Sequence, residues 1–137
     1  MKPEFVTLAQ YRLEKARKTL EDAVLFSGRA TSGTIVNRIY YALFYAVTAL
    51  LITDEKYSAK HSGVRSLFNR DFVKTGIIPV ADGKFFSEMY DSRQEGDYGD
   101  YKEFTSEEIT SWLDNARSFI DRVGAIVVER CGGKAEK

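Results

Sequence analysis

Apolar residues recur at intervals of three and four along most of the chain, the spacing that places side chains on one face of an α-helix. This pattern predicts five helical segments joined by short connections. The segments are expected at about 3–26, 34–52, 58–76, 79–93 and 105–130. Only two prolines occur, Pro3 and Pro79, and neither lies in the interior of a periodic segment. The sequence therefore predicts an all-α fold, an up-and-down bundle of four to five helices.

The second segment differs from the others because it is apolar nearly all round. From Ile39 to Ile52 every residue except Thr48 is apolar or aromatic. This run is shorter than the roughly 20 residues that cross a bilayer, so it predicts a core helix and no membrane span. So much apolar surface on one helix of a small domain also predicts a homodimer that buries part of it.

Several helix ends carry recognisable signals. Ser58 is expected to cap the third helix and Gly76 to end it. Pro79 suits the first turn of the fourth helix. Thr105 and Glu108 have the spacing of a capping box at the start of the fifth helix.

The fourth helix is expected to end near Arg93. Its apolar positions, which are predicted to point inward, are Val80, Phe85, Phe86 and Met89. The stretch 94–102 then interleaves glycines with acids and tyrosines, and predicts a loop or a frayed helix end.

The length of 137 residues predicts one domain, residues 1–130, followed by a frayed tail at 131–137. Twenty basic and twenty acidic residues give a formal net charge of zero, which argues against a general nucleic-acid-coating protein. One cysteine, Cys131, and one histidine, His61, are too few for an internal disulfide or a closed Cys/His zinc site. No metal or cofactor is expected. No export leader is visible, so the cytoplasm is the expected location.

A polar stripe follows one side of the second segment. Asn37, Tyr41, Tyr45 and Thr48 are spaced by four, four and three residues. One interpretation is a hydrogen-bond network that fixes helix register, because a buried polar group without a partner costs about 1–3 kcal/mol. The other is a polar cleft, with Arg38 beside it, that holds a base or a phosphate.

His61 lies one helical turn before Arg65. A histidine beside a cation can act as a general base or bind an anion. A single histidine near a helix start is also a common surface or capping residue. Both interpretations stay open.

The run from Arg93 to Tyr101 is poor core material and lies where a loop is expected. One interpretation is a helix terminus at which Arg93 pairs with Asp97 or Glu95. The other is a functional loop in which Arg93, Asp97 and Tyr98 take part.

Four stretches of the chain together resemble the HEPN-domain family. They are NRIYYALFYA at 37–46, KHSGV at 60–64, FVKTG at 72–76, and Arg93 with Asp97 and Tyr98. The resemblance extends from about Leu8 to Val123. More narrowly, the chain is similar to small stand-alone HEPN proteins of the UPF0332-like group.

The resemblance implies a prokaryotic helical bundle that dimerises and that often pairs with a minimal nucleotidyltransferase in a toxin–antitoxin module. Many HEPN proteins are metal-independent ribonucleases. In these, an arginine is followed four to six residues later by a histidine, and the two form a composite site across the dimer. The histidine moves protons at the ribose 2′-OH and the arginine stabilises the phosphorane charge.

This sequence departs from that catalytic motif. Arg93 matches the arginine of the motif, but Tyr98 stands where a histidine would be expected, and no histidine follows. Tyrosine, with a reference pKa near 10, is a poor general base at neutral pH. The sole histidine, His61, belongs to another predicted helix.

Three hypotheses follow. The leading one is a cytoplasmic homodimer that binds a nucleotidyltransferase, a nucleotide or RNA, with weak or absent catalysis, through Asn37, Arg38, Tyr41, Arg93 and Tyr98. The second is a metal-independent ribonuclease that uses Arg93 with Tyr98, Asp97 or His61. The third is a purely structural dimeric interaction module.

Overall fold

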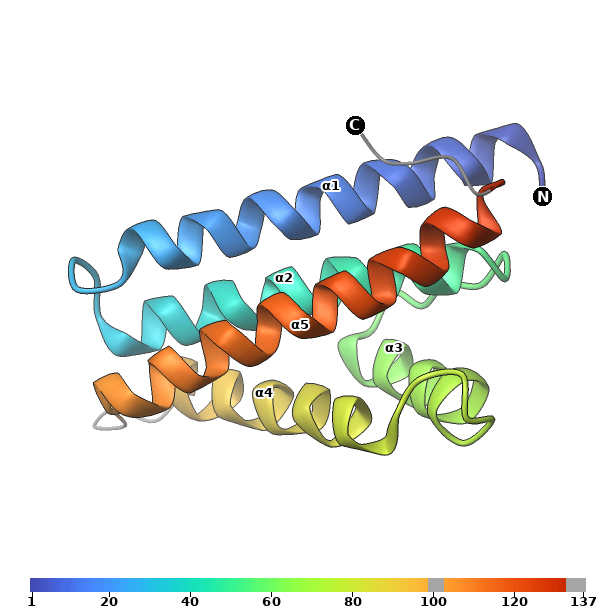
Figure 1. Ribbon diagram of the computed structural model, residues 1–137. Coiled ribbons are helices and arrows are strands. Elements are labelled where there is room, and N and C mark those ends of the chain that lie inside the picture. Colours follow the sequence, from blue (N-terminus) through green and yellow to red (C-terminus); the bar gives the residue numbers. More distant parts are fainter. Residues whose placement is uncertain (99–102, 133–137) are drawn as a thin grey trace.

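The architecture is a bundle of helices. The structure is a computed structural model that describes residues 1–98 and 103–132, without the side chains of 95–98. Its elements in chain order are α1 (Pro3–Phe26), α2 (Ser32–Ile52), α3 (His61–Phe68), the π-helical turn η1 (Asn69–Val73), α4 (Val80–Tyr98) and α5 (Ser106–Arg130). The described residues form no strand, so the all-α prediction is confirmed. Figure 1 shows the four long helices side by side, with the short α3 next to α4.

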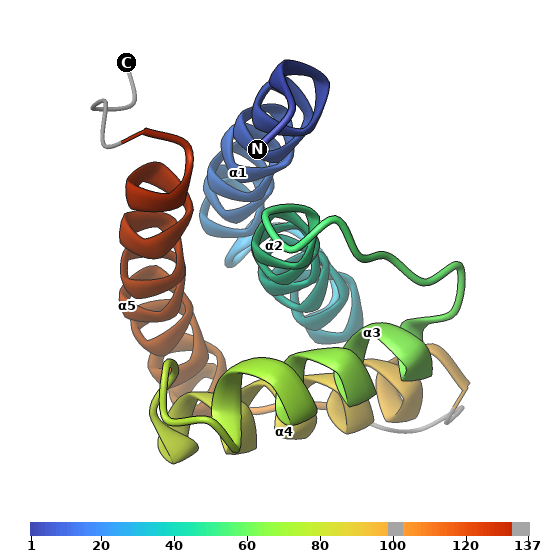
Figure 2. The ribbon, with the colours of Figure 1, turned by 90° about the vertical axis from the view of Figure 1, so that its right-hand side faces the viewer.

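The helix α2 is the centre of the bundle. It packs against α1, α3, α4 and α5, and the end-on view of Figure 2 shows α1 and α5 on one side of it and α3 and α4 beneath it. By length and composition α2 could cross a membrane, but 67% of its apolar window is buried inside the bundle. A helix that is apolar nearly all round is expected in such a position. The prediction of a core helix is confirmed.

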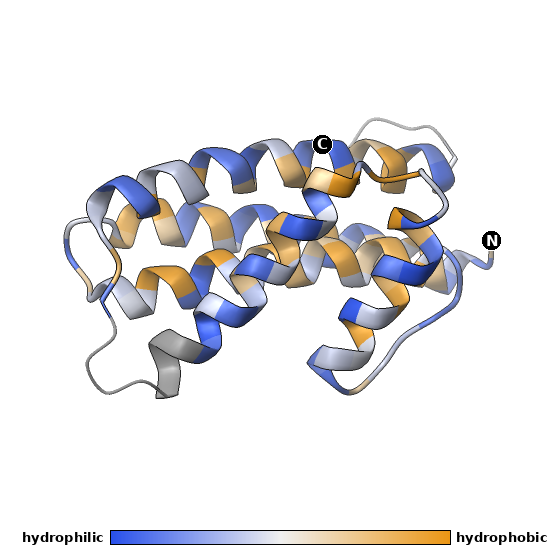
Figure 3. Ribbon diagram, turned by 90° about the horizontal axis from the view of Figure 1, so that it is seen from below, coloured by the Kyte–Doolittle hydropathy of each residue, from blue (hydrophilic) through white to orange (hydrophobic). Residues whose placement is uncertain are grey.

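The outer helices each bury one face. On α1 the buried stripe includes Leu13 and Leu20, and on α5 it includes Ile120 and Val127. Figure 3 shows hydrophobic and hydrophilic residues alternating along the ribbon. This alternation is the period of about 3.6 residues that the sequence displays.

The starts of the helices were predicted with mixed success. The capping box of α5 is confirmed: the Glu108 N–H donates to Thr105 Oγ1 (3.1 Å), and the Thr105 N–H donates to Glu108 Oε1 (3.0 Å). The helix α2 begins at Ser32 and not at Thr34, because the Thr31 hydroxyl caps it by accepting from the Thr34 N–H.

The prediction that Ser58 caps the third helix is wrong. The helix α3 begins at His61, and its N-cap Lys60 makes no side-chain capping bond. The Ser58 hydroxyl instead accepts from the Lys60 N–H (3.2 Å) and lies directly against Gly63. A Cβ at Gly63 would overlap that hydroxyl, so any larger residue in this position of KHSGV would force Ser58 to shift.

Two expectations about α4 are corrected. The helix does not end near Arg93 but continues to Tyr98, so the first part of the expected loop is helical; residues 99–102 lie outside the described residues. Phe85, Phe86 and Met89 are buried as predicted, whereas Val80 is 60% exposed. Val80 lies between the buried Ile78 and Asp82, on the side of the first turn of α4 that faces the solvent.

Candidate functional site

Aromatic, histidine and arginine side chains lie close together where the start of α3 meets α2 and α4. We call this group the His61 cluster; its members are Tyr40, Tyr41, Phe44, His61, Arg65, Tyr90 and Arg93. His61 is the first residue of α3, and its Nδ1 lies 2.8 Å from the hydroxyl of the fully buried Tyr40. Phe44, one turn after Tyr40 on α2, stacks on the imidazole with 4.4 Å between ring centres. The tertiary packing therefore fixes the orientation of the imidazole.

Two arginines cover the tyrosines of the cluster. The guanidinium carbon of Arg93 lies 5.0 Å from the centre of the Tyr40 ring, and that of Arg65 lies 4.2 Å from the centre of the Tyr90 ring. The two rings meet edge to face at 6.0 Å. Arg65 also forms an ion pair with Asp91 (3.8 Å). Stacking on a ring holds a guanidinium in place and leaves it positively charged.

The environment shifts two pKa values in the cluster. Burial lowers the pKa of His61 from its ordinary value of 6.5, and the positive charge of Arg93 lowers it further. Burial raises the pKa of Tyr40, and Arg93 partly offsets this rise. At neutral pH His61 is therefore a neutral imidazole and Tyr40 a protonated phenol.

The influence of Arg93 on His61 can be measured directly, because the chain has one histidine. We expect Arg93→Gln to raise the pKa of His61 towards 6.5, since one of the two causes of its depression is removed. A pH titration of the single imidazole by NMR measures this shift. The exposed Lys84→Gln on the same helix is the control, and an unchanged pKa in Arg93→Gln would contradict the close approach.

A lowered histidine pKa also affects stability in a defined direction. Between the folded-state pKa of His61 and 6.5, the unfolded chain binds more protons than the folded protein. The contribution of His61 to the free energy of unfolding is therefore present above pH 6.5 and is lost as the pH falls through this window.

Of the residues proposed on α2, Tyr41 belongs to the His61 cluster, and Asn37 and Arg38 lie beside it. Tyr41 contacts the His61 ring edge to face, with 5.5 Å between centres. The Arg38 guanidinium carbon lies 5.3 Å from the Tyr41 ring centre, and Arg38 Nη2 donates to Asn37 Oδ1 (3.0 Å). Asn37, Arg38 and Tyr41 are all half-buried. They form one continuous strip that leads from the start of α2 to His61.

The comparison with protein families identifies the chain. The model described as "HEPN domain" matches residues 9–126, which is most of the sequence. The chain belongs to the HEPN family. The resemblance seen in the sequence is confirmed.

Several named relatives of this HEPN protein are similar along most of their length. A "UPF0332 protein" of Thermotoga maritima is 42% identical over 88% of this chain and 91% of its own. "Putative toxin MJ0142" of Methanocaldococcus jannaschii is 34% identical over 86% of this chain and 80% of its own. A second protein of that organism, "Putative toxin MJ0605", is 33% identical over 83% of this chain and 84% of its own. This HEPN protein is thus related to two proteins that carry the name "putative toxin".

The structure brings some of the predicted catalytic residues together. Arg93 and His61 meet at Tyr40, although they belong to different helices. Asp97 and Tyr98 lie in the last turn of α4, but their side chains are outside the described residues.

Sequence reasoning did not include Tyr40, Phe44 and Tyr90 among the site residues. All three are apolar or aromatic positions on helices with buried faces, so the sequence alone assigns them to the core. The sequence already placed Arg65 beside His61, because Arg65 lies one turn after His61 and therefore on the same side of α3.

A metal site is not visible in the part of the chain that the structure describes. Residues 1–98 and 103–132 contain no group of three or more His, Cys, Asp or Glu side chains that could hold a metal ion. The donors present at the His61 cluster, guanidinium groups and an imidazole, are suited to anions instead.

Proposed function

We propose that this HEPN protein is a cytoplasmic, toxin-class protein that binds single-stranded RNA or a nucleotide through the His61 cluster, with weak or absent catalysis. The observation that carries the proposal is the placement of Arg93 over Tyr40, whose hydroxyl meets His61. Guanidinium groups recognise phosphate oxygens, and half-buried rings such as Tyr41 offer surfaces on which bases stack. A cationic and aromatic surface of this kind suits single strands better than duplexes.

The proposal includes two protein partners. We propose that two copies form a homodimer and that the dimer pairs with a minimal nucleotidyltransferase as in a toxin–antitoxin module. The toxin names of two relatives support the module. The half-buried Tyr45 on α2, which lies outside the His61 cluster, supports the dimer because it leaves aromatic area to cover.

The mass in solution tests the dimer. We expect light scattering at micromolar concentration to give twice the mass of one chain. Tyr45→Glu, which places a charge on the half-buried side of α2, is expected to lower the mass to that of a monomer, while the exposed Tyr11→Glu on α1 leaves the dimer intact. A monomeric mass for the unmodified protein would contradict the dimer.

Binding of RNA tests the central proposal. We expect Arg93→Ala to weaken the binding of a single-stranded RNA oligomer about tenfold, the equivalent of about 1.4 kcal/mol. Loss of one phosphate contact should also reduce the slope of log K against log salt by about 0.7. Fluorescence anisotropy at several salt concentrations, without metal, measures both.

Lys84→Ala is the matched control for this experiment. Lys84 is an exposed cation on α4, as Arg93 is a cation on α4, but it takes no part in the His61 cluster. Equal RNA affinity of Arg93→Ala, Lys84→Ala and the unmodified protein would contradict the proposal.

A second candidate function is favoured by the state of His61. Its lowered pKa keeps the imidazole neutral at pH 7, and Arg93 lies near enough to influence it. A neutral imidazole can accept the proton of a ribose 2′-OH while an arginine stabilises the charge on phosphorus. These are the requirements of a metal-independent ribonuclease. Cleavage of single-stranded RNA in EDTA that is lost in both His61→Gln and Arg93→Ala would establish this activity.

A further inference from the structure

The contact between Tyr40 and His61 determines which ring nitrogen of the imidazole carries the proton. The Tyr40 hydroxyl lies 2.8 Å from His61 Nδ1, and among the described residues it has no other hydrogen-bond partner. Tyr40 is fully buried, and burial raises the pKa of its phenol, so the hydroxyl keeps its proton at neutral pH. A buried O–H without an acceptor would lose the hydrogen bond that it makes to water in the unfolded chain. The Tyr40 hydroxyl therefore donates, and Nδ1 accepts.

The proton of the neutral imidazole then lies on Nε2. A neutral histidine carries one N–H, and the hydrogen bond made by one ring nitrogen decides which of the two holds the proton. Within residues 1–98 and 103–132, Nε2 forms no hydrogen bond. It is also not enclosed, because His61 is half-buried and the enclosed side-chain atoms of this part of the chain that lack a hydrogen bond belong to other residues. His61 thus presents an N–H donor at the surface.

Neighbouring rings hold this donor in one position. Phe44 stacks on the imidazole with 4.4 Å between ring centres, and Tyr41 meets it edge to face at 5.5 Å. Half a rotation of the imidazole would place a carbon atom opposite the Tyr40 hydroxyl, so the hydrogen bond selects the orientation of the ring as well as its tautomer. A donor that is fixed before the ligand arrives loses less conformational entropy on binding.

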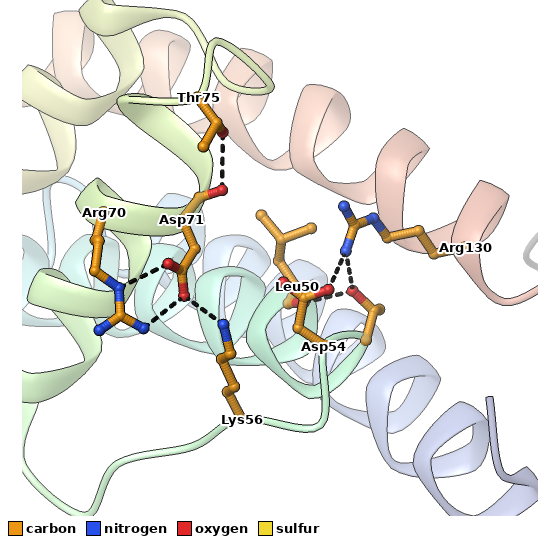
Figure 4. A network of polar contacts seen from close by, with 8 residues as sticks. Leu50, Asp54, Lys56, Arg70, Asp71, Thr75 and Arg130 are labelled. Carbon is orange, nitrogen blue, oxygen red and sulfur yellow. Dashed lines mark hydrogen bonds and ion pairs between the residues drawn. The ribbon is translucent and has the colours of Figure 1, made fainter.

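A polar network outside the His61 cluster shows the contrast. Lys56 Nζ donates to Asp71 Oδ2 (2.8 Å), and Arg70 Nε donates to Asp71 Oδ1 (2.7 Å), as Figure 4 shows. The protein itself supplies the acceptor for both of these cations. For His61 Nε2 the described part of the chain supplies none, so its acceptor is water or a ligand.

We propose that His61 Nε2–H donates a hydrogen bond to a phosphate oxygen of the bound RNA, and that Tyr40 is the positioning residue that keeps the proton on this nitrogen. The inference rests on the proposed function, which places the RNA at the His61 cluster. The Arg93 guanidinium carbon, 5.0 Å from the centre of the Tyr40 ring, supplies positive charge beside the same pair. An N–H donates a stronger hydrogen bond to an anionic oxygen than to a neutral one, so a phosphate is the acceptor that this donor favours.

The tautomer separates the two functions proposed above. A ring nitrogen that already holds a proton donates a hydrogen bond and cannot accept the proton of a ribose 2′-OH. A ribonuclease that uses His61 as its base needs the opposite tautomer, with Nε2 unprotonated and Nδ1–H donating to the Tyr40 oxygen. The hydrogen bonding of Tyr40 therefore favours binding over catalysis at His61.

NMR can identify the tautomer directly, because the chain has one histidine. We expect long-range ¹H–¹⁵N spectra of the full chain at neutral pH to show Nε2 protonated and Nδ1 unprotonated. Addition of a single-stranded RNA oligomer should shift the Nε2–H resonance. Tyr40→Phe, which keeps the ring and removes the hydroxyl, should allow the Nδ1–H tautomer to appear. A proton on Nδ1 in the unmodified protein, an Nε2–H resonance that bound RNA does not shift, or an unchanged tautomer in Tyr40→Phe would overturn the inference.

Two substitutions of His61 test the donor itself. Glutamine places an amide N–H near the position of Nε2, whereas asparagine places one near the position of Nδ1, beside Tyr40. We expect His61→Gln to bind a single-stranded RNA oligomer about fivefold more tightly than His61→Asn, the difference made by one hydrogen bond. Fluorescence anisotropy at low salt without metal measures both affinities.

Further variants separate this inference from the proposed function. The control Arg70→Gln removes a cation that is 63% exposed and pairs with Asp71 outside the cluster, so it should keep the RNA affinity of the unmodified protein. If His61→Gln and His61→Asn bind alike while Arg93→Ala still weakens binding, the donor role of His61 is wrong and the proposed function stands. If the unmodified protein does not bind the oligomer, both are wrong.

Discussion

Replacing Phe86 by alanine is expected to lower the free energy of unfolding by about 3–5 kcal/mol, the range for removing a buried phenylalanine ring. Phe86 is fully buried on α4 and joins three other elements. Its ring centre lies 5.9 Å from that of Tyr40 on α2, 5.4 Å from that of Phe68 on α3 and 6.2 Å from that of Phe119 on α5. A cavity in this place would weaken the packing of four elements at once.

Urea unfolding followed by circular dichroism measures the effect. Leu25→Ala is the control, because Leu25 is 63% exposed on α1 and its loss should change the free energy of unfolding by no more than about 0.5 kcal/mol. Phe86→Leu should lower the free energy of unfolding by an amount between those of Phe86→Ala and Leu25→Ala. A loss below about 1 kcal/mol for Phe86→Ala would mean that the aromatic core does not hold α3 and α4 against α2 and α5.

Asp82→Asn is expected to lower the free energy of unfolding by about 1.5–3 kcal/mol, the range for hydrogen bonds to a charged group. Asp82 is 4% exposed near the start of α4 and accepts two hydrogen bonds from Arg122 on α5, at 2.7 Å from Nε and 2.5 Å from Nη2. Asparagine keeps the shape but can accept at only one oxygen. The two-fold bond that joins α4 to α5 is then lost, although Arg122 remains half in water.

Asp121→Asn on α5 is the matched control. Asp121 pairs with Arg17 on α1 (3.0 Å), but it is 65% exposed, so this bridge should contribute no more than about 1 kcal/mol. Thermal and urea unfolding of both variants gives the comparison. Equal stability losses in the two variants would contradict the special role of the buried carboxylate.

Local sequence predicted the start of α5 correctly but misplaced the starts of α2 and α3. The capping box of Thr105 and Glu108 needs only residues three positions apart, and it was predicted correctly. Ser58 was assigned wrongly because its hydroxyl is used against Gly63 and the Lys60 N–H, a contact that composition does not reveal. The end of α4 was placed too early for a related reason. Glycines in the stretch after Arg93 suggested a loop, but α4 continues to Tyr98.

The sequence by itself determined the helical class, the core position of α2 and the membership of the HEPN family suggested by its motifs. Periodicity and motif spacing are properties of neighbours along the chain, so they are visible without a structure. Only the tertiary structure decided that His61 on α3 and Arg93 on α4 meet at Tyr40 on α2. These contacts depend on how three helices pack together, and the spacing of residues within one helix does not encode that arrangement.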